Sequence, residues 1–398
     1  MIDLKAARND RAAYRAALAR KGAGETFDEL LDADERWRAL VPRVDELRGR
    51  TKLKGRPTSE QLGKLQGVKE ELRAAEEELA AAEAERDALA LRVPNLPHEA
   101  IPDGSTENEV EELRRVGQPA EAESREHTEV GRFDMERAAR MSGARFGYWI
   151  GDTARLGLAL YRFALERLSE KGFISVLPPV LVREEALVGT GAFPSDEASV
   201  YELPADGLYL AGTAEIPLAS LHAGEILSVE ELPLRYVAFS PCFRREAGAA
   251  GRDTRGMIRV HQFNKVEQFS LTTPETSWDE HELLLANTEE LVRELGLPYR
   301  VVVLPAGDIS SAAAKTYDVE IWFPSQGRYR ETASISNTTD FQARRLSIRH
   351  RGKHGLEPVH TLNGTAVVDR MTLAILENFG GGVPDVLHAF GAPERVER

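Results

Sequence analysis

Cysteine is almost missing from this chain, which has a single one, Cys242, among 398 residues. One thiol excludes an internal disulfide and a thiolate metal cluster. Long apolar runs are also missing, since no stretch approaches the roughly 20 apolar residues that a membrane helix needs. The first ten residues, MIDLKAARND, are charged and lack the apolar core of a signal peptide. We therefore expect a soluble protein of the reducing cytoplasm, with no membrane partner.

Positive charge is in deficit: 51 Lys and Arg face 65 Asp and Glu, a formal net charge of -14. General nucleic-acid-coating proteins draw their affinity from phosphate neutralisation, so this balance argues against that class and against DNA as a partner. It leaves room for a local basic site. Hydrophobic residues make up 42% of the chain, which is ample for a core and excludes global disorder. The length suggests roughly two or three domains.

Several common catalytic motifs are absent as well. The sequence has no GxxxxGK phosphate loop, no GxGxxG after a strand, no HExxH and no GxSxG. His261, His350 and His360 have no second ligand at metal-ligand spacing. We interpret these histidines as structural or phosphate-facing, and we expect no zinc.

Mostly apolar residues between positions 27 and 92 repeat at alternating spacings of three and four, the a/d pattern of a coiled coil. The first series is Leu30, Ala33, Trp37, Leu40, Val44, Leu47 and Thr51. The second is Leu65, Val68, Leu72, Ala75, Leu79, Ala82, Arg86 and Leu89. Gly55 and Pro57 lie between the two series as helix breakers. The pattern predicts an antiparallel helical hairpin, in which Pro42 should kink the first helix or end it early.

The predicted tip of this hairpin is basic. Its cations are Arg48, Arg50, Lys52, Lys54 and Arg56. The return helix is acidic, as in EELRAAEEELAAAEAE. A basic tip on an acidic stalk is either a local phosphate-seeking element or an ordinary solvated charge run. The hairpin as a whole is also compatible with an oligomerisation coiled coil.

From about Phe146 the pattern changes to mixed helices and strands. Residues 152–172 predict an amphipathic helix, and FISVLPPVLV (173–182) predicts a buried extended segment. Short alternating segments between Gly and Pro turns predict strands within 207–218, 234–246, 259–271, 299–307, 317–325 and 329–336. Their hairpin-like spacing predicts an antiparallel β-sheet flanked by helices, which is an α+β domain.

The residues that carry chemistry concentrate between positions 234 and 269. Strand alternation puts Cys242, Arg244 and Glu246 on one face of the first strand. On the return strand, one face holds Arg259, His261, Phe263, Lys265 and Glu267. Guanidinium, aromatic and carboxylate groups together suit a nucleotide, since Arg binds phosphate and an aromatic ring stacks on a base. The alternative is a solvated sheet face with paired charges.

These residues belong to longer motifs that resemble a known family. The segment FSPCFRREAGAAGRDTRGMIRVHQFNKVEQF is similar to the motif 2 hairpin of class II aminoacyl-tRNA synthetases, specifically the seryl-tRNA synthetases. GFISVLPPVLV, with Pro179, resembles their motif 1. GTAEIPL, AAAKTYDVEIW, YRETASISNTTDFQARR and VHTLNGT resemble further seryl-type signatures. The resemblance implies a tRNA-binding domain over 1–100, with its coiled-coil arm at about 28–92, and a class II catalytic domain over 101–398.

The resemblance also implies an ATP site. Arg244 would hold the α-phosphate and the substrate carboxylate, Glu246 would contact the adenine side, and Phe263 would stack on the base. Arg370 resembles the motif 3 arginine on the γ-phosphate. Glu331 and Ser334 match a Mg²⁺-binding pair. The catalytic residues would be Arg244, Glu331 and Arg370.

A serine pocket is implied next to it. Thr213 and Glu215 match positions around the serine amino group, and Arg244 faces the carboxylate. Glu267 and Thr365 would flank the hydroxyl, with Asn363 in the same pocket. A buried carboxylate that accepts the hydroxyl proton would reject alanine, because that carboxylate would then lack a partner.

The implied function is activation of L-serine with ATP and Mg²⁺ to seryl-adenylate and its transfer to tRNA(Ser) and tRNA(Sec), by a homodimer that forms through motif 1. Tip residues 48–56 would contact tRNA. Three alternatives remain: a divergent paralog serving antibiotic resistance or biosynthesis, an enzyme that loads an aminoacyl carrier protein, or an inactive RNA-binding paralog. The chain departs from the family in a shorter arm, in Asp369 beside Arg370, and in the ENFGGGVPDVLHAF continuation.

Overall fold

The computed structural model describes residues 1–52, 59–119, 125–247, 256–353 and 355–397. These residues fold into two compact units, Met1–Leu96 and Pro97–Arg398, each with its own hydrophobic core. Lys54 and Arg56 of the predicted basic tip lie outside the described residues. Among the residues that are described, no helix has both the length and the apolarity needed to cross a bilayer.

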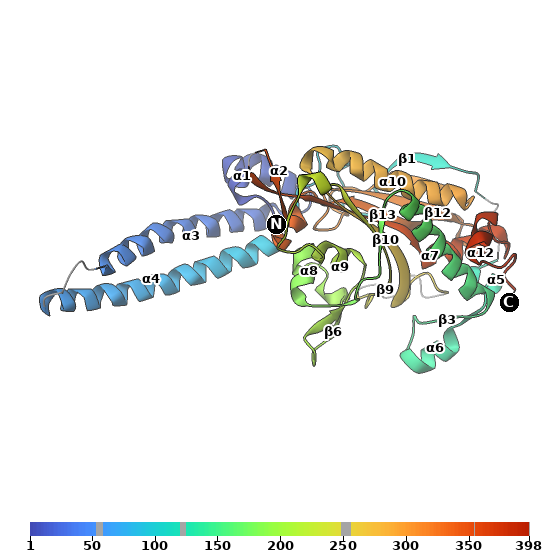
Figure 1. Ribbon diagram of the computed structural model, residues 1–398, viewed down its shortest axis with the longest axis horizontal. Helices are drawn as coiled ribbons and strands as arrows, with labels where there is room; N and C mark the ends of the chain where they lie inside the picture. Colours follow the sequence, from blue (N-terminus) through green and yellow to red (C-terminus); the bar gives the residue numbers. More distant parts are fainter. Residues whose placement is uncertain (53–58, 120–124, 248–255, 354, 398) are drawn as a thin grey trace. The chain divides into compact units, whose positions relative to one another are not determined.

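The first unit is helical, and its two longest helices form a hairpin (Figure 1). Its helices are α1 (Leu4–Asn9), α2 (Arg11–Ala19), α3 (Gly24–Thr51) and α4 (Ser59–Arg92). Buried between α3 and α4 are heptad positions of both predicted series, Leu30, Ala33, Val44, Leu47 and Ala75. The predicted antiparallel hairpin is therefore confirmed.

Helix α3 continues through Pro42, so the alternative that this residue ends the helix early is wrong. Proline removes one backbone N–H and crowds the preceding turn, at a cost of about 3 kcal/mol in a helix interior. Contacts on both sides of the proline offset that cost. Val44 shares a small buried cluster with Ala75, and the Arg36 guanidinium lies 2.7 Å from the Glu85 carboxylate across the hairpin.

An eight-stranded sheet forms the centre of the second unit. In spatial order its strands are β1 (Glu111–Val116), β11 (Tyr299–Val303), β12 (Lys315–Phe323), β13 (Arg328–Asn337), β16 (His360–Val368), β10 (Gln262–Thr272), β9 (Leu234–Phe243) and β4 (Ile174–Val176). All neighbours pair antiparallel except β4 and β9, which run parallel. The predicted α+β class with a mainly antiparallel sheet is confirmed.

Shorter elements surround this sheet. The helices are α5 (His127–Val130), α6 (Met135–Ser142), α7 (Asp152–Glu170), α8 (Glu184–Thr190), α9 (Glu215–Ser220), α10 (Ser277–Glu294), α11 (Phe341–Leu346) and α12 (Asp369–Phe379). The short strands are β2 (Phe133–Asp134), β3 (Tyr148–Trp149), β5 (Leu181–Val182), β6 (Tyr201–Leu203), β7 (Leu208–Leu210), β8 (Ile226–Leu227), β14 (Arg349–Gly352) and β15 (Gly355–Pro358). Single 3₁₀ turns occur at Glu197–Ser199, Val229–Glu231, Pro274–Thr276 and Pro324–Gln326, and a longer 3₁₀ segment at Asp385–Phe390.

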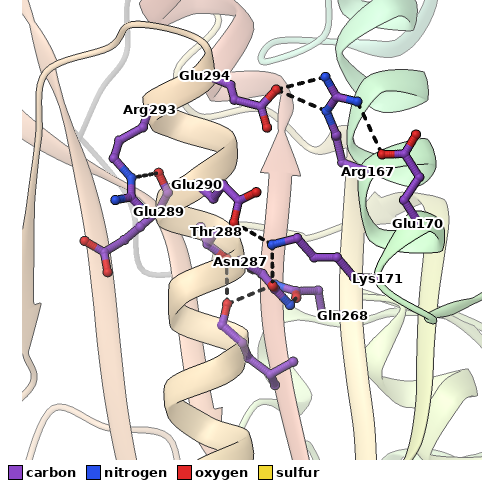
Figure 2. Close-up of polar contacts among 11 residues, drawn as sticks. Arg167, Glu170, Lys171, Gln268, Asn287, Thr288, Glu289, Glu290, Arg293 and Glu294 are labelled. Atoms are coloured by element: carbon purple, nitrogen blue, oxygen red, sulfur yellow. Dashed lines mark hydrogen bonds and ion pairs between the residues drawn. The ribbon is translucent and has the colours of Figure 1, made fainter.

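Helix α10 is fixed to the sheet by a polar network that Figure 2 shows. Gln268 of β10 is fully buried, yet its amide donates to Thr288 Oγ1 at 3.1 Å and accepts from Asn287 Nδ2 at 2.9 Å. Lys171, just after α7, reaches Glu290 at 2.6 Å and Asn287 Oδ1 at 3.0 Å. A buried amide costs free energy unless it is hydrogen-bonded. This network therefore holds α10 in one register over β10.

The segment 173–182, predicted to be buried, is largely exposed, and that prediction is wrong for most of its length. Leu177, Ile174 and Leu181 leave 82%, 54% and 46% of their surface accessible, whereas Phe173 is buried. Strand β4 is an edge strand, and the described part of the chain gives it no neighbour on its outer side. An apolar pattern indicates a surface to be shielded from water, but it does not tell which chain shields it.

Residues 207–218, predicted as a strand, divide into strand β7 and helix α9, so the prediction is wrong for the second half. Strand β7 ends at Leu210, and α9 begins at Glu215. Pro217 falls in the first turn of α9, where its missing N–H leaves no intrahelical hydrogen bond unmade. The turn between the two elements carries Thr213.

We expect Leu47→Ala to loosen the hairpin locally without affecting the second unit. Leu47 is buried with Val44 and Ala75, and removal of a buried leucine side chain costs about 2–5 kcal/mol. Amide hydrogen exchange should accelerate in α3 and α4 around this cluster and stay unchanged in the central sheet. Glu46→Ala, at an exposed position of the same helix, is the matched control. Unchanged exchange in the Leu47 variant would contradict the assigned seam.

Candidate active site

A cavity of about 320 Å³ is lined by β10, β13 and β16, by residues that directly follow β9 and by the start of α12. The structure brings into it every residue predicted for ATP, serine and magnesium. They are Thr213, Glu215, Arg244, Glu246, Phe263, Glu267, Glu331, Ser334, Asn363, Thr365 and Arg370. These residues come from positions spread over more than 150 residues of the chain, so the fold assembles the site.

Two residues predicted for the same sheet face do not line this cavity in the described part of the chain. Cys242 is fully buried, beside Ser240, and burial raises the pKa of its thiol. The His261 ring lies 5.3 Å from the Phe146 ring, centre to centre. Strand β10 begins one residue later, so His261 lies outside the alternation that was used to place it.

Two β-bulges decide which side chains face the cavity. The pairing of β12 with β13 skips Thr332, and the pairing of β10 with β16 skips Ala366. Neighbouring residues of a strand point to opposite faces, and an extra residue resets that alternation. Glu331 and Ser334 therefore both reach the cavity although they are three positions apart.

One group of lining residues, the carboxylate cluster, consists of Glu215 and Glu267 with their partners. Glu267 is buried, accepts a hydrogen bond from Thr213 Oγ1 at 3.0 Å and pairs with Lys265. Lys265 also donates to Thr213 Oγ1 at 2.7 Å. Gln342 Nε2 donates to Glu215 Oε1 at 2.7 Å. Burial, and then the charge of Glu267, raise the pKa of Glu215 to about 7. A cation bound here would favour the ionised form of Glu215.

Neither Lys265 nor Gln342 was assigned a binding or catalytic role from the sequence. Strand alternation did place Lys265 on the same face as Glu267, two residues before it, but assigned it no contact. Gln342 lies in α11, and no local pattern connects it to Glu215.

The second group, the arginine cluster, consists of Arg244, Arg259 and Arg370 with the ring of Phe263. The guanidinium carbon of Arg244 lies 5.2 Å from the centre of the Phe263 ring. Arg259 pairs with Glu246. The arginine cluster therefore combines the aromatic ring of Phe263 with the three guanidinium groups.

Arg370 is held by backbone carbonyls. It donates to the carbonyl oxygens of Glu331 and Ile258, the latter at 3.4 Å. Among the described residues its buried Nε has no hydrogen-bond partner, and burial lowers the pKa of the guanidinium. An unpaired buried donor costs about 1–3 kcal/mol. An anion such as a phosphate oxygen at this position would satisfy it.

Asp369, next to Arg370 in sequence, is directed elsewhere. Its carboxylate accepts hydrogen bonds from the backbone N–H of Asn264 at 2.9 Å and from the Tyr161 hydroxyl. Burial raises the pKa of Asp369 to about 6. Asp369 therefore joins the start of α12 to β10 and α7.

The donor set of Glu331 and Ser334 fits a magnesium ion shared with a phosphate. Magnesium is usually held by one or two carboxylates together with substrate phosphates and water. Glu331 has a carboxylate that is half exposed, and Ser334 interacts with the buried Asp318, whose pKa is raised by burial and by the charge of Glu331. Among the described residues, no group of three or more His, Cys, Asp or Glu side chains could hold a metal ion. A magnesium ion at Glu331 and Ser334 would therefore need substrate phosphates and water as further ligands.

The described cations of the predicted tRNA-binding tip are largely paired within the hairpin. Arg48 lies 3.0 Å from Glu76, and Arg50 lies 3.9 Å from Glu71. Lys52 is exposed at the end of α3.

Comparisons with known proteins match both units. A family model described as "tRNA synthetase class II core domain (G, H, P, S and T)" matches residues 201–379, and one described as "Seryl-tRNA synthetase N-terminal domain" matches residues 1–97. A serine–tRNA ligase of Thermobifida fusca is 45% identical over 394 residues, covering 95% of this chain and 93% of the relative.

Two solved structures share the fold over nearly the whole chain. A seryl-tRNA synthetase from Pyrococcus horikoshii, complexed with ATP, has a TM-score of 0.92 and 38% identity and covers 100% of this chain and 99% of its own. A cytoplasmic serine–tRNA ligase from Naegleria fowleri, in complex with AMP, has a TM-score of 0.87 and 31% identity, with coverages of 96% and 95%.

Asp369→Asn should remove one pH dependence of stability. The folded-state pKa of about 6 lies above the usual 3.8, so the folded protein holds this proton more tightly than the unfolded chain does. Stability is therefore lost as the pH rises from about 4 to about 6, by about 3 kcal/mol in total. The asparagine side-chain carbonyl can still accept the hydrogen bond from the Asn264 backbone N–H. Because asparagine does not titrate, the variant should not lose stability over this pH range. Urea unfolding of both proteins from pH 4 to 8 measures this: their difference should move in favour of the variant as pH rises, and a constant difference would contradict it.

Proposed function

Because this chain belongs to the seryl-tRNA synthetase family and is a serine–tRNA ligase, we propose that its cavity binds ATP at the arginine cluster and serine at the carboxylate cluster. The observation that carries this proposal is the presence of both clusters in one cavity. The relatives solved with ATP and with AMP support a nucleotide in the same fold. The relatives do not favour a carrier-protein enzyme, a resistance or biosynthesis paralog or an inactive paralog.

Each member of the arginine cluster contacts a different part of ATP in this proposal. Phe263 stacks on the adenine, and Glu246, which Arg259 orients, accepts from its amino group. Arg244 binds the α-phosphate and the serine carboxylate. Arg370 binds the γ-phosphate through its unpartnered Nε. Glu331 and Ser334 would hold Mg²⁺, which supplies charge neutralisation on the phosphates.

The carboxylate cluster recognises serine in two ways. Ionised Glu215 pairs with the ammonium group, with Thr213 beside it. Glu267 and Thr365 contact the hydroxyl, with Asn363 in the same pocket. Since Lys265 already neutralises Glu267, this carboxylate can accept a hydrogen bond from a neutral hydroxyl without a net charge in the pocket.

The reaction needs no protein nucleophile. The serine carboxylate attacks the α-phosphorus, a new P–O bond forms, and pyrophosphate leaves with the electrons of the broken bond. Positioning and cationic stabilisation by Arg244 and Arg370 are sufficient kinds of catalysis for this step. The 3′-terminal hydroxyl of tRNA then attacks the adenylate carbonyl and releases AMP.

We further propose that residues 1–100 bind tRNA(Ser), and tRNA(Sec), through the arm, in a cytoplasmic enzyme, while residues 101–398 carry the chemistry. Arg48, Arg50, Lys52, Lys54 and Arg56 would supply the contacts. Those from Arg48 and Arg50 would have to compete with Glu76 and Glu71 of α4. Phosphates along an RNA helix are suitable competitors, because they carry one charge per nucleotide.

We propose a homodimer that forms through the edge strand β4, because apolar side chains are exposed there. The sheet ends at β4, where Ile174, Leu177 and Leu181 are exposed. An apolar strip beside an unpaired strand edge is a typical surface for a self-complementary twofold contact.

Glu267→Gln should weaken serine activation selectively. The change removes the anionic acceptor while it keeps the side-chain size. We expect kcat/KM for serine to fall. The loss of transition-state stabilisation calculated from it should be at least about 1.5–3 kcal/mol, the range for a hydrogen bond to a charged group. Serine-dependent ATP–pyrophosphate exchange measures it, and the KM for ATP should change little. Glu185→Gln, at an exposed position of α8, is the control. If serine kinetics are unchanged in the Glu267 variant, the hydroxyl is recognised elsewhere.

Leu177→Asp should separate the dimer. It places a carboxylate in an apolar contact, where an unpaired charge is strongly unfavourable. Sedimentation should show a dimer for the unchanged protein and a monomer for the variant. Leu113→Asp, on β1 at the opposite edge of the sheet and 41% exposed, is the matched control and should stay dimeric. An unchanged protein that is a stable monomer and still charges tRNA would refute the proposed assembly.

A further inference from the structure

A buried histidine outside the cavity contacts the backbone of one cavity wall. His127 of α5 is 1% exposed, and its Nε2 lies 3.1 Å from the backbone nitrogen of Met257. Residues 257–260 line the cavity. None of the roles proposed above uses His127.

The contacts of His127 determine its tautomer. The Met257 N–H can only donate, so Nε2 must be the unprotonated, accepting nitrogen. Nδ1 lies 2.8 Å from Glu377 Oε1 and therefore carries the proton and donates it. The same carboxylate is fixed by the backbone N–H groups of His127 (3.3 Å) and Ser325 (3.2 Å). The result is a buried Glu377–His127–Met257 relay.

The relay acts together with a second contact from the same helix. Glu377 and Arg370 are seven residues apart in α12, about two turns, and so lie on one side of it. Arg370 donates to the carbonyl of Ile258, the residue after Met257. Two consecutive backbone groups of this wall are thus held from α12, one directly and one through His127. Helix α5 lies next to α12 in Figure 1.

The wall in turn carries Arg259, which pairs with Glu246 of the arginine cluster. The backbone at the beginning of this wall leaves space for the His127 imidazole. Gly256 has a φ of +67°, and a Cβ there would lie 2.6 Å from His127 Nε2. A side chain at this position would displace the imidazole. The backbone before Met257 therefore leaves room for this histidine.

We propose that His127 is a positioning residue for ATP: as the neutral Nδ1–H tautomer it fixes the 257–259 wall so that Arg259 and Glu246 are preset for the nucleotide. The proposal rests on the proposed function in that it places ATP at the arginine cluster. Among the described residues, Met257 is the cavity-lining residue to which His127 is hydrogen-bonded. Removal of His127 therefore affects ATP and leaves the carboxylate cluster in place.

Two near-isosteric variants separate the two halves of the relay. In His127→Asn the amide nitrogen lies where Nδ1 lay and keeps the Glu377 contact, but nothing reaches Met257. In His127→Gln the longer side chain can place its carbonyl oxygen where Nε2 lay and accept from Met257. We expect the KM for ATP in exchange to rise about tenfold in the asparagine variant, which corresponds to about 1.4 kcal/mol, and to stay within about threefold in the glutamine variant. The KM for serine should change by less than about twofold in both.

Equal rises in both variants, or no rise in either, would overturn the proposal, because a packing role does not distinguish Met257 from Glu377. A spectrum of the unchanged protein with ¹⁵N-labelled histidine gives an independent readout that does not depend on how the variants fold. A protonated Nε2 at His127 would overturn the proposal, and an unprotonated one coupled to the Met257 amide would support it. If the unchanged protein lacks serine-dependent exchange, the proposed function fails, while direct ATP binding by the two variants still tests His127.

Discussion

The pairing of β10 with β9 on one side and with β16 on the other is the constraint on which the site depends. It places Phe263 and Glu267 on the cavity side and Gln268 on the opposite side. A slip of one residue would exchange the two faces of the strand. On the opposite side, Gln268 donates to Thr288 of α10 (Figure 2). The Thr288 hydroxyl also donates to the carbonyl of Thr365. Helix α10, on the face of the sheet opposite the cavity, therefore helps to fix the pairing register of β10 and with it the residues that face the cavity.

That register brings like charges together at a cost in stability. Glu267 is buried and Glu215 half-buried, and desolvation together with the charge of Glu267 raises the pKa of Glu215 to about 7. Replacement of such a cluster by apolar residues would often stabilise a protein. Lys265, Thr213 and Gln342 reduce the cost by hydrogen bonding, but they do not remove it. Functional sites are where such a local conflict is expected.

Most of the fold could be predicted from periodicity, because heptad spacing and strand alternation are direct consequences of burial on one side. Val44 and Leu47 are buried where the heptads put them. The effect of Pro42 was harder to predict from the sequence. The free-energy cost of a proline inside a helix is local, whereas the packing that offsets it comes from α4, which lies farther along the chain. Leu177 was placed wrongly because an apolar residue in a sequence does not reveal which chain covers it.

The site could be predicted only as far as sequence motifs reach. The family resemblance identified the ATP, serine and magnesium residues that line the cavity. Strand alternation put Lys265 on the face that the structure shows. The bulges at Thr332 and Ala366 depend on how distant strands pair. Gln342 and His127 act through single hydrogen bonds across the fold, and such contacts have no signature in the sequence.

The ion pairs of the arm affect how selectively it could bind one RNA over another polyanion. Where Arg48 and Arg50 lie beside Glu76 and Glu71, an RNA phosphate gains less Coulomb energy than it would from an uncompensated cation, since the glutamate repels it at the same time. Any polyanion profits from bare positive charge, so a bare arm would bind RNA indiscriminately. An arm whose arginines are paired in this way would bind well only where an RNA backbone followed its contour over many contacts. If the arm binds RNA as proposed, the pairing of Arg48 and Arg50 would make its affinity depend more on the shape of the RNA than on charge alone.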